Sequence, residues 1–223
     1  MRSLTKCLLL ATLCGTANPA LANEDTAYWQ NLNLTLKVND EFRVSSETSF
    51  RSSDARGFYQ LQETLMVGYK PSKNVTIWAG YVHSPGYNHG DFAFMERRFR
   101  QQVNVDNLAR IGSVKINGRV RLEQRWRDNT AGTGWRLRPS LRATVPVVGK
   151  VNLVIGNESF FNLNTTSFQN RDGVERMRNS AALSIPRSKS ITIEVGYMNQ
   201  HAFVRAGPDN VDHVLTTALS VSL

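Results

Sequence analysis

Alternation between charged and apolar residues, with a period of two, most restricts how this chain can fold. In the stretch 118–127, apolar residues alternate with Arg119, Arg121, Glu123 and Arg125. The stretch 134–147 repeats the pattern, with Arg136, Arg138 and Arg142 between apolar positions. Successive side chains of a β-strand point to opposite faces, so a period of two predicts strands with one charged and one apolar face.

The same alternation recurs along residues 28–223, and no stretch shows the apolar spacing of an amphipathic helix. About eleven strand-like segments can be counted between clusters of turn-forming residues. Bacterial single-chain barrels have an even number of strands. The hairpin dipeptide Asn117-Gly118 would supply a twelfth strand by separating 104–116 from 119–127. We therefore predict an all-β, antiparallel up-and-down transmembrane β-barrel of about twelve strands, or of ten if 28–38 lies outside the wall.

Short and longer connections alternate between the predicted strands. Short turns are expected at 39–40, 71–74, 148–150 and 186–189, and longer polar loops at 84–91, 128–133, 162–172 and 206–210. This alternation is typical of bacterial barrels, which have short periplasmic turns and longer outer loops.

The kind of basic residue indicates which face of the strands is enclosed. The chain has 20 arginines and 7 lysines, and the lysines fall mainly at turns while the arginines fall within the strands. Arginine is planar, weakly hydrated and multidentate, so it suits confined ion-pair networks better than open surface. The charged face is therefore expected to line the interior, whereas a soluble barrel such as a lipocalin would put its apolar face inside.

Two further features favour a membrane barrel. The C-terminal residues alternate to the end, through Leu215, Leu219, Val221 and Leu223, which is similar to the signal that barrels present to their assembly machinery, although the usual final aromatic residue is replaced by leucine. Aromatic residues near strand ends form the second feature, as an interfacial girdle would: Trp126, Trp135, Tyr69, Tyr81 and Tyr197. Glu63 and Arg97 fit this interpretation poorly, because the alternation places both on the lipid-facing side.

The N-terminal residues resemble a secretory signal. Arg2 and Lys6 precede a short apolar run, and Ala20-Leu21-Ala22 matches a cleavage site. We predict a cleaved signal peptide at 1–22 and a barrel domain at 23–223, located in the outer membrane of a Gram-negative bacterium. Both cysteines lie in the signal, so no disulfide is expected; the rival lipoprotein interpretation of Cys14 conflicts with Leu13, where a small residue is required. Outer-membrane lipid, lipopolysaccharide and the barrel-assembly machinery are the expected partners, and secretion argues against nucleic acid despite the net charge of +9.

Two runs, 96–102 (ERRFRQQ) and 119–125 (RVRLEQR), carry a resemblance to a known family. Weaker matches lie at 136–138, 157–162 and 169–171. In this order and spacing the chain resembles the bacterial family catalogued as domain of unknown function 2490, over nearly all of residues 23–223. The resemblance implies an outer-membrane barrel with no transferable activity. It also implies that the residues before Arg119 continue one strand, which conflicts with a turn at Asn117-Gly118.

The charged face supplies the candidate functional residues. The predicted lumen-lining residues are Glu96, Arg98, Arg100, Arg119, Arg121, Glu123, Arg125, Arg136, Arg138, Arg142, Glu158, Arg176 and Arg178. Adjacent strands would place Arg121 and Glu123 near Arg136 and Arg138, in a ladder of Arg–Glu pairs. This ladder supports two hypotheses: such pairs close the lumen and serve structure alone, or the surplus of arginine makes a narrow pore that attracts small anions.

The histidines give little support for catalysis. His83, His89, His201 and His213 occur without a nucleophile-elbow motif and without the spacing of metal ligands. We therefore predict no catalytic residue, no metal and no cofactor, and hence no enzyme. An outer-membrane lipid-modifying enzyme is the alternative.

Overall fold

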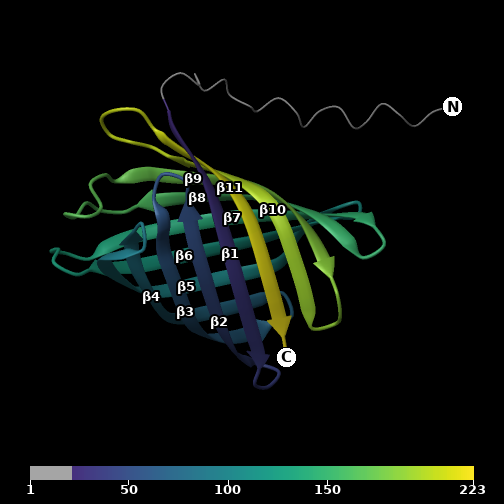
Figure 1. Ribbon diagram of the computed structural model, residues 1–223. Helices are drawn as coiled ribbons and strands as arrows, with labels where there is room; N and C mark the ends of the chain where they lie inside the picture. Colours follow the sequence, from purple (N-terminus) through teal and green to yellow (C-terminus); the bar gives the residue numbers. More distant parts are fainter. Residues whose placement is uncertain (1–21) are drawn as a thin grey trace.

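The computed structural model describes residues 22–223, which form a closed β-barrel (Figure 1). The predicted all-β, antiparallel up-and-down barrel is confirmed, with eleven strands in the described residues. The strands are β1 (Asn23–Lys37), β2 (Phe42–Ser53), β3 (Gly57–Ser72), β4 (Val75–Asn88), β5 (Asp91–Ile111), β6 (Val114–Arg127), β7 (Gly134–Val148), β8 (Val151–Asn162), β9 (Gly173–Pro186), β10 (Ile191–Ala202) and β11 (Asn210–Ser222). The predicted signal peptide, 1–22, lies outside the described residues except for Ala22.

The barrel closes through a parallel pair, β1 with β11, whereas all other neighbouring strands are antiparallel. The register of this pair runs from Asn23 opposite Asn210 to Thr35 opposite Ser222. The C-terminal Leu223 continues the ladder: its N–H donates to the Thr35 carbonyl at 2.9 Å, and its carbonyl accepts from the Lys37 N–H at 2.8 Å. An odd number of strands thus closes without an unpaired edge.

The strand count falls between the predicted twelve and ten, for two reasons. β1 belongs to the wall, and the expected turn at Asn117-Gly118 does not form. Gly118 lies within β6, opposite Val105 and Leu141. The Asn117 side chain accepts a hydrogen bond from the Asn107 N–H at 2.8 Å, across a bulge that lets β5 continue to Ile111. Residues 104–111 therefore extend β5 instead of forming a separate strand.

Successive connections between the strands lie at opposite ends of the barrel. The end named here the turn end carries 38–41, 73–74, 112–113, 149–150 and 187–190, together with the C-terminus. The other end, the loop end, carries 54–56, 89–90, 128–133, 163–172 and 203–209. The predicted long loop at 84–91 is wrong: β4 and β5 meet at His89 and Gly90, whose φ angles of 51° and 93° suit the tight hairpin turn that demands two positive φ angles.

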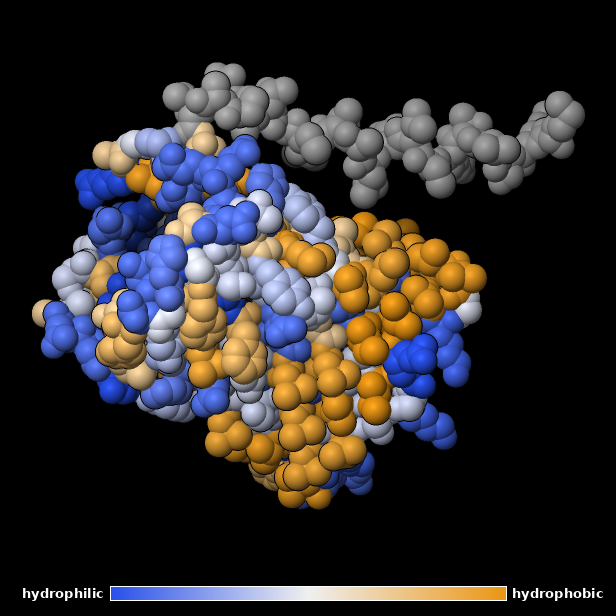
Figure 2. Space-filling view, in the orientation of Figure 1, coloured by the Kyte–Doolittle hydropathy of each residue, from blue (hydrophilic) through white to orange (hydrophobic). Residues whose placement is uncertain are grey.

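The charged face of the strands points inwards and the apolar face points outwards. In β6, Arg121 is 5% exposed whereas its neighbour Val120 is 51% exposed, and the same alternation recurs around the wall. Figure 2 shows hydrophobic residues covering the wall towards the turn end and hydrophilic residues gathered round the loop end at upper left. A buried apolar cluster is small, comprising Ala27, Trp29, Met198 and Val214. The barrel is therefore filled mainly by polar and charged side chains.

Glu63 and Arg97 point outwards, as the alternation predicts. They lie in one row across neighbouring strands, because Glu63 is opposite His83 and His83 is opposite Arg97. Arg97 forms an ion pair with Asp128, in the 128–133 loop. The row therefore lies towards the loop end of the wall, within reach of the 128–133 loop. No helix long and apolar enough to cross a bilayer is found in 22–223.

Candidate functional site

A cavity of about 610 Å³ extends from the loop end into the middle of the barrel. Its lining begins at Arg56, Phe168 and Asn170 in the loops and reaches Asn33 and Arg142 on the strands. Because the lining comes from strands on all sides of the barrel, the cavity occupies the lumen and is not a groove in the wall.

The structure brings the predicted lumen residues together. Every one of them except Glu123 lines the cavity, namely Glu96, Arg98, Arg100, Arg119, Arg121, Arg125, Arg136, Arg138, Arg142, Glu158, Arg176 and Arg178. Glu123 is fully buried behind the arginines of this lining.

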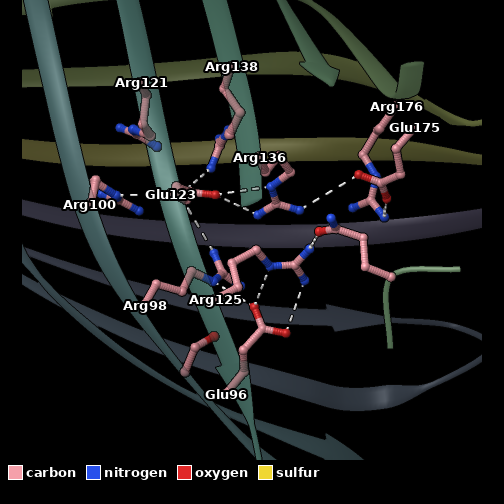
Figure 3. Close-up of polar contacts among 12 residues, drawn as sticks. Glu96, Arg98, Arg100, Arg121, Glu123, Arg125, Arg136, Arg138, Glu175 and Arg176 are labelled. Atoms are coloured by element: carbon pink, nitrogen blue, oxygen red, sulfur yellow. Dashed lines mark hydrogen bonds and ion pairs between the residues drawn. The ribbon is translucent and has the colours of Figure 1, made fainter. Parts of the chain in front are cut away.

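Glu123 is the centre of a buried ion-pair network (Figure 3). One carboxylate oxygen lies 2.6 Å from Arg136 Nη2, and the other lies 2.9 Å from Arg138 Nη1. Arg100 Nε is 3.5 Å away and Arg98 Nη1 is 4.0 Å away. Four guanidinium groups thus share one carboxylate, which holds β5, β6 and β7 in register on the lumen side.

Two other glutamates are shared in the same way. Glu96 accepts from Arg98 Nε at 2.7 Å and from Arg125 and Arg127, each at 3.0 Å. Glu158 on β8 is bound by three arginines, with Arg138 at 2.9 Å, Arg178 at 3.5 Å and a short contact from Arg119. Charge-assisted bonds of this kind satisfy the carboxylates and fix the arginine side chains.

The predicted Arg–Glu ladder forms at one of its two positions. Glu123 lies opposite Arg136, and Arg121 lies opposite Arg138. Both β7 arginines turn towards Glu123, whereas Arg121 Nε donates to the Gln102 side chain at 2.7 Å. In Figure 3 dashed lines surround Glu123 but none reaches Arg121.

Aromatic side chains in the lumen were missed by the sequence analysis. Trp29 lies between two guanidinium groups, Arg51 at 4.0 Å and Arg178 at 4.8 Å from its ring, and its Nε1 donates to Tyr59 Oη at 2.6 Å. Phe160 is buried beneath the guanidinium groups of Arg136, Arg138, Arg176 and Arg178. Cation–π contacts further stabilise these buried guanidinium groups. Trp29 is spaced by two residues from Asn31, which is in turn two from Asn33. This spacing was the sequence signal that places the Trp29 side chain on the same face as these polar residues.

The loop 163–172 folds back into the barrel mouth. Gln169 is buried; its carbonyl oxygen accepts from Arg125 Nη1 at 2.9 Å and its amide donates to the Asn164 and Trp135 carbonyls. Phe168 lies 5.5 Å from the guanidinium of Arg125. The sequence indicated a polar loop here but carried no periodic signal for an inward-facing segment.

Towards the turn end, most inward positions of β9–β11 hold small residues, namely Ser180, Ala182, Ser184, Gly196, Ala218 and Ser220. Glu194, which lies opposite Ser184 and Ala218, is the charged exception. On the facing wall, a second cavity of about 160 Å³ is lined by residues that include Met66, Trp78 and Asn104. Asn33 and Glu47 line both cavities. The two cavities therefore adjoin at β1 and β2.

The lining carries a large excess of positive charge. Thirteen arginines and four glutamates line the main cavity. Glu123 behind them, and Asp25, Asp212 and Glu194, which pair with the lining arginines Arg56 and Arg142, bring the carboxylates to eight. The cavity is therefore surrounded by five more positive than negative charges, and the guanidinium groups keep their charge at any pH a protein meets.

The histidines lie apart from this network. His83 points outwards, while its neighbour Ser84 points into the barrel and accepts from Gln60 at 3.0 Å, so the two cannot act together. His201 hydrogen-bonds Asp209 at 2.7 Å at the loop end, and this bond lowers the pKa of the Asp209 carboxyl below its ordinary value. No group of three or more metal-ligating side chains occurs among residues 22–223.

Comparison with known proteins identifies the family to which this chain belongs. A relative from Methylorubrum extorquens, itself uncharacterised, is 32% identical over 224 residues, covering 96% of each chain. Among solved structures, LpxR from Salmonella typhimurium matches with a TM-score of 0.47 at 10% identity, over 80% of this chain and 83% of that one. The family model described as protein of unknown function DUF2490 matches residues 26–212. The chain therefore belongs to the DUF2490 family.

Proposed function

We propose that the protein is an outer-membrane β-barrel of a Gram-negative bacterium, and that its lumen attracts and passes small anions. One observation carries the proposal: thirteen arginines and only four glutamates line a lumenal cavity of about 610 Å³. A confined passage with surplus arginine lowers the barrier for anions and raises it for cations.

The outer wall supports the membrane location. Large apolar residues on every strand face outwards, among them Leu65, Val103, Leu141 and Leu215, each at least 39% exposed. A water-soluble protein rarely exposes a continuous apolar surface of this extent. Outer-membrane lipid and lipopolysaccharide are the proposed contacts of this wall. β11, with its alternating apolar residues, is the proposed contact of the barrel-assembly machinery.

A pore is favoured over a closed, purely structural lumen by the distribution of the ion pairs. The shared carboxylates Glu96, Glu123 and Glu158 hold their arginines along the β5–β8 wall. Most inward positions of the opposite wall near the turn end hold small residues, and the Arg142–Glu194 pair also reaches this wall. We therefore propose that the ion pairs stiffen the β5–β8 wall and that a charged passage runs beside it.

Conductance across a planar lipid bilayer tests the proposal. In a potassium chloride gradient, the refolded protein is expected to conduct with a reversal potential displaced from zero towards the chloride equilibrium potential, because the lumen concentrates anions. Absence of conductance would show that the lumen is closed, and a displacement towards the potassium equilibrium potential would contradict anion preference.

A matched pair of variants locates the selectivity in the lumen. Arg142 points into the lumen and pairs with Glu194 at 3.0 Å, whereas Arg97 points outwards and pairs with Asp128. Arg142→Gln is expected to move the reversal potential towards zero, because the lumen loses a cation. Arg97→Gln removes the same charge from the outer wall and should leave the reversal potential unchanged; equal shifts in both variants would argue against a lumenal origin.

Lipid modification is the alternative activity, and it makes a different prediction. Conversion of phospholipid or lipopolysaccharide by the purified barrel, lost in His83→Ala, would replace the transport proposal with an enzymatic one. The outward orientation of His83, away from the arginine network, would let it meet lipid.

A further inference from the structure

Arg121 is the one predicted member of the lumenal network whose charge the structure leaves without a carboxylate, although it is buried. Its side chain is 5% exposed, and the partner of its Nε is the amide oxygen of Gln102. Within residues 22–223, no carboxylate oxygen lies within 4.0 Å of its guanidinium nitrogens. A buried charge without a counter-charge is unfavourable, and arginine cannot escape by losing its proton.

The carboxylates near Arg121 are already engaged by other arginines. Glu123, two residues along β6, is shared by Arg98, Arg100, Arg136 and Arg138. Glu158 pairs with Arg119, Arg138 and Arg178, and Glu47 accepts from Arg100 at 2.9 Å. A movement of these carboxylates towards Arg121 would leave another buried arginine without its counter-ion. The network therefore cannot neutralise Arg121 from within.

Two neighbouring arginines have donors without a hydrogen bond in the same region. Within the described part of the chain, the buried Nε of Arg119 has no hydrogen-bond partner, and the buried Nε of Arg100 makes no hydrogen bond although it lies 3.5 Å from Glu123. Arg119 precedes Arg121 by two residues on the lumen face of β6, and Arg100 lies on β5 two residues from Gln102, which is opposite Arg121. All three side chains line the main cavity.

We propose that Arg100, Arg119 and Arg121 form a binding site for a multidentate oxyanion of the phosphate class in the lumen. The proposal deepens the anion-passing function and rests on it for access through the same cavity. Guanidinium groups present planar, paired N–H donors that match the oxygens of phosphate, whereas a single spherical halide satisfies them poorly. The surplus positive charge of the surrounding lining would draw such an anion in and hold it beside Arg121, which no carboxylate of residues 22–223 neutralises.

Isothermal titration calorimetry of the full chain in detergent tests the site with inorganic phosphate as the probe. Titrations in phosphate and in chloride at equal ionic strength separate oxyanion recognition from general attraction. The wild type is expected to bind one phosphate in preference to chloride, and Arg121→Gln is expected to weaken phosphate binding about tenfold to hundredfold, the effect of losing charge-assisted hydrogen bonds. Arg110→Gln removes an exposed arginine at the turn end and should bind phosphate as the wild type does.

Folding does not confound this test, because Arg121→Gln orphans no carboxylate and the variant is expected to refold. Arg121→Lys serves as a second variant that keeps the charge but loses the planar fork, so it should lose the preference for phosphate over chloride. Equal affinity of the wild type for phosphate and chloride, or unchanged phosphate affinity in both Arg121 variants, would overturn the site.

The calorimetric result is independent of conduction. Phosphate binding at Arg121 without bilayer conductance would support the phosphate site and contradict the anion passage. Anion conductance without a preference for phosphate would support the passage and contradict the site.

Discussion

Replacement of Glu123 by glutamine is expected to lower the free energy of unfolding by about 3–5 kcal/mol, the cost of removing one partner from a buried ion-pair network. Glu123 has no exposed surface and is shared by Arg136, Arg138, Arg100 and Arg98. Glutamine keeps the shape of the side chain but removes its charge, so four buried guanidinium groups lose their common counter-ion. Urea unfolding from phospholipid vesicles, followed by tryptophan fluorescence, measures the change.

Glu194→Gln is the matched control for this effect. Glu194 also faces the lumen, but it pairs with Arg142 alone, and the two side chains are 27% and 51% exposed. Solvent screens an ion pair of this kind, so its loss should cost less than about 1 kcal/mol. Similar destabilisation in the two variants would mean that the Glu123 network contributes no more than a surface ion pair.

Replacement of Val67 by arginine should also destabilise the barrel strongly if its wall faces lipid. Val67 lies on the outer face of β3, between the row containing Glu63 and the turn end, and is 56% exposed. An arginine on the lipid face near the bilayer midplane costs about 2–4 kcal/mol, falling to about 0–1 kcal/mol near the interfaces. The free energy of folding into vesicles, measured in urea, reports the cost directly.

Val148→Arg makes the same substitution at the edge of the wall. Val148 is the last residue of β7 at the turn end and is 70% exposed, so the substitution there should have little effect. In a water-facing wall both substitutions would be nearly neutral, because both valines are already exposed. Equal, small effects at the two positions would therefore contradict the membrane location.

The alternation of side chains predicted the strands, the inside of the barrel and the lumenal residues. This prediction succeeds because the alternation fixes both faces of each strand at once. Arginines such as Arg121 and Arg138 share the enclosed face, and the valines and leucines between them therefore point to the other face. The prediction needs only local periodicity, so it holds even where the order of neighbouring strands is unknown.

The details that escaped prediction depend on contacts between distant residues. Asn117-Gly118 has the sequence of a hairpin turn, yet pairing with β5 and β7 on both sides holds it in a strand. The parallel closure of β1 with β11 has no local sequence signal, because it joins the two ends of the chain. Gln169 reaches the lumen from a loop without periodicity, and the isolation of Arg121 from carboxylates results from how neighbouring arginines divide Glu123 and Glu158 among them.

Because the number of strands is odd, the first and last residues of the barrel domain lie at opposite ends of the barrel. The chain enters β1 beside the 203–209 loop, where the Asn23 N–H donates to the Asp209 carbonyl at 2.8 Å, and it leaves β11 among the turns at Leu223. In a bilayer, a peptide epitope joined before Asn23 and one joined after Leu223 would lie in different compartments. Antibody labelling of intact and permeabilised cells would then report the orientation of the barrel from one doubly tagged chain, with each tag as the control for the other, whereas both tags of an even-stranded barrel would lie on one side.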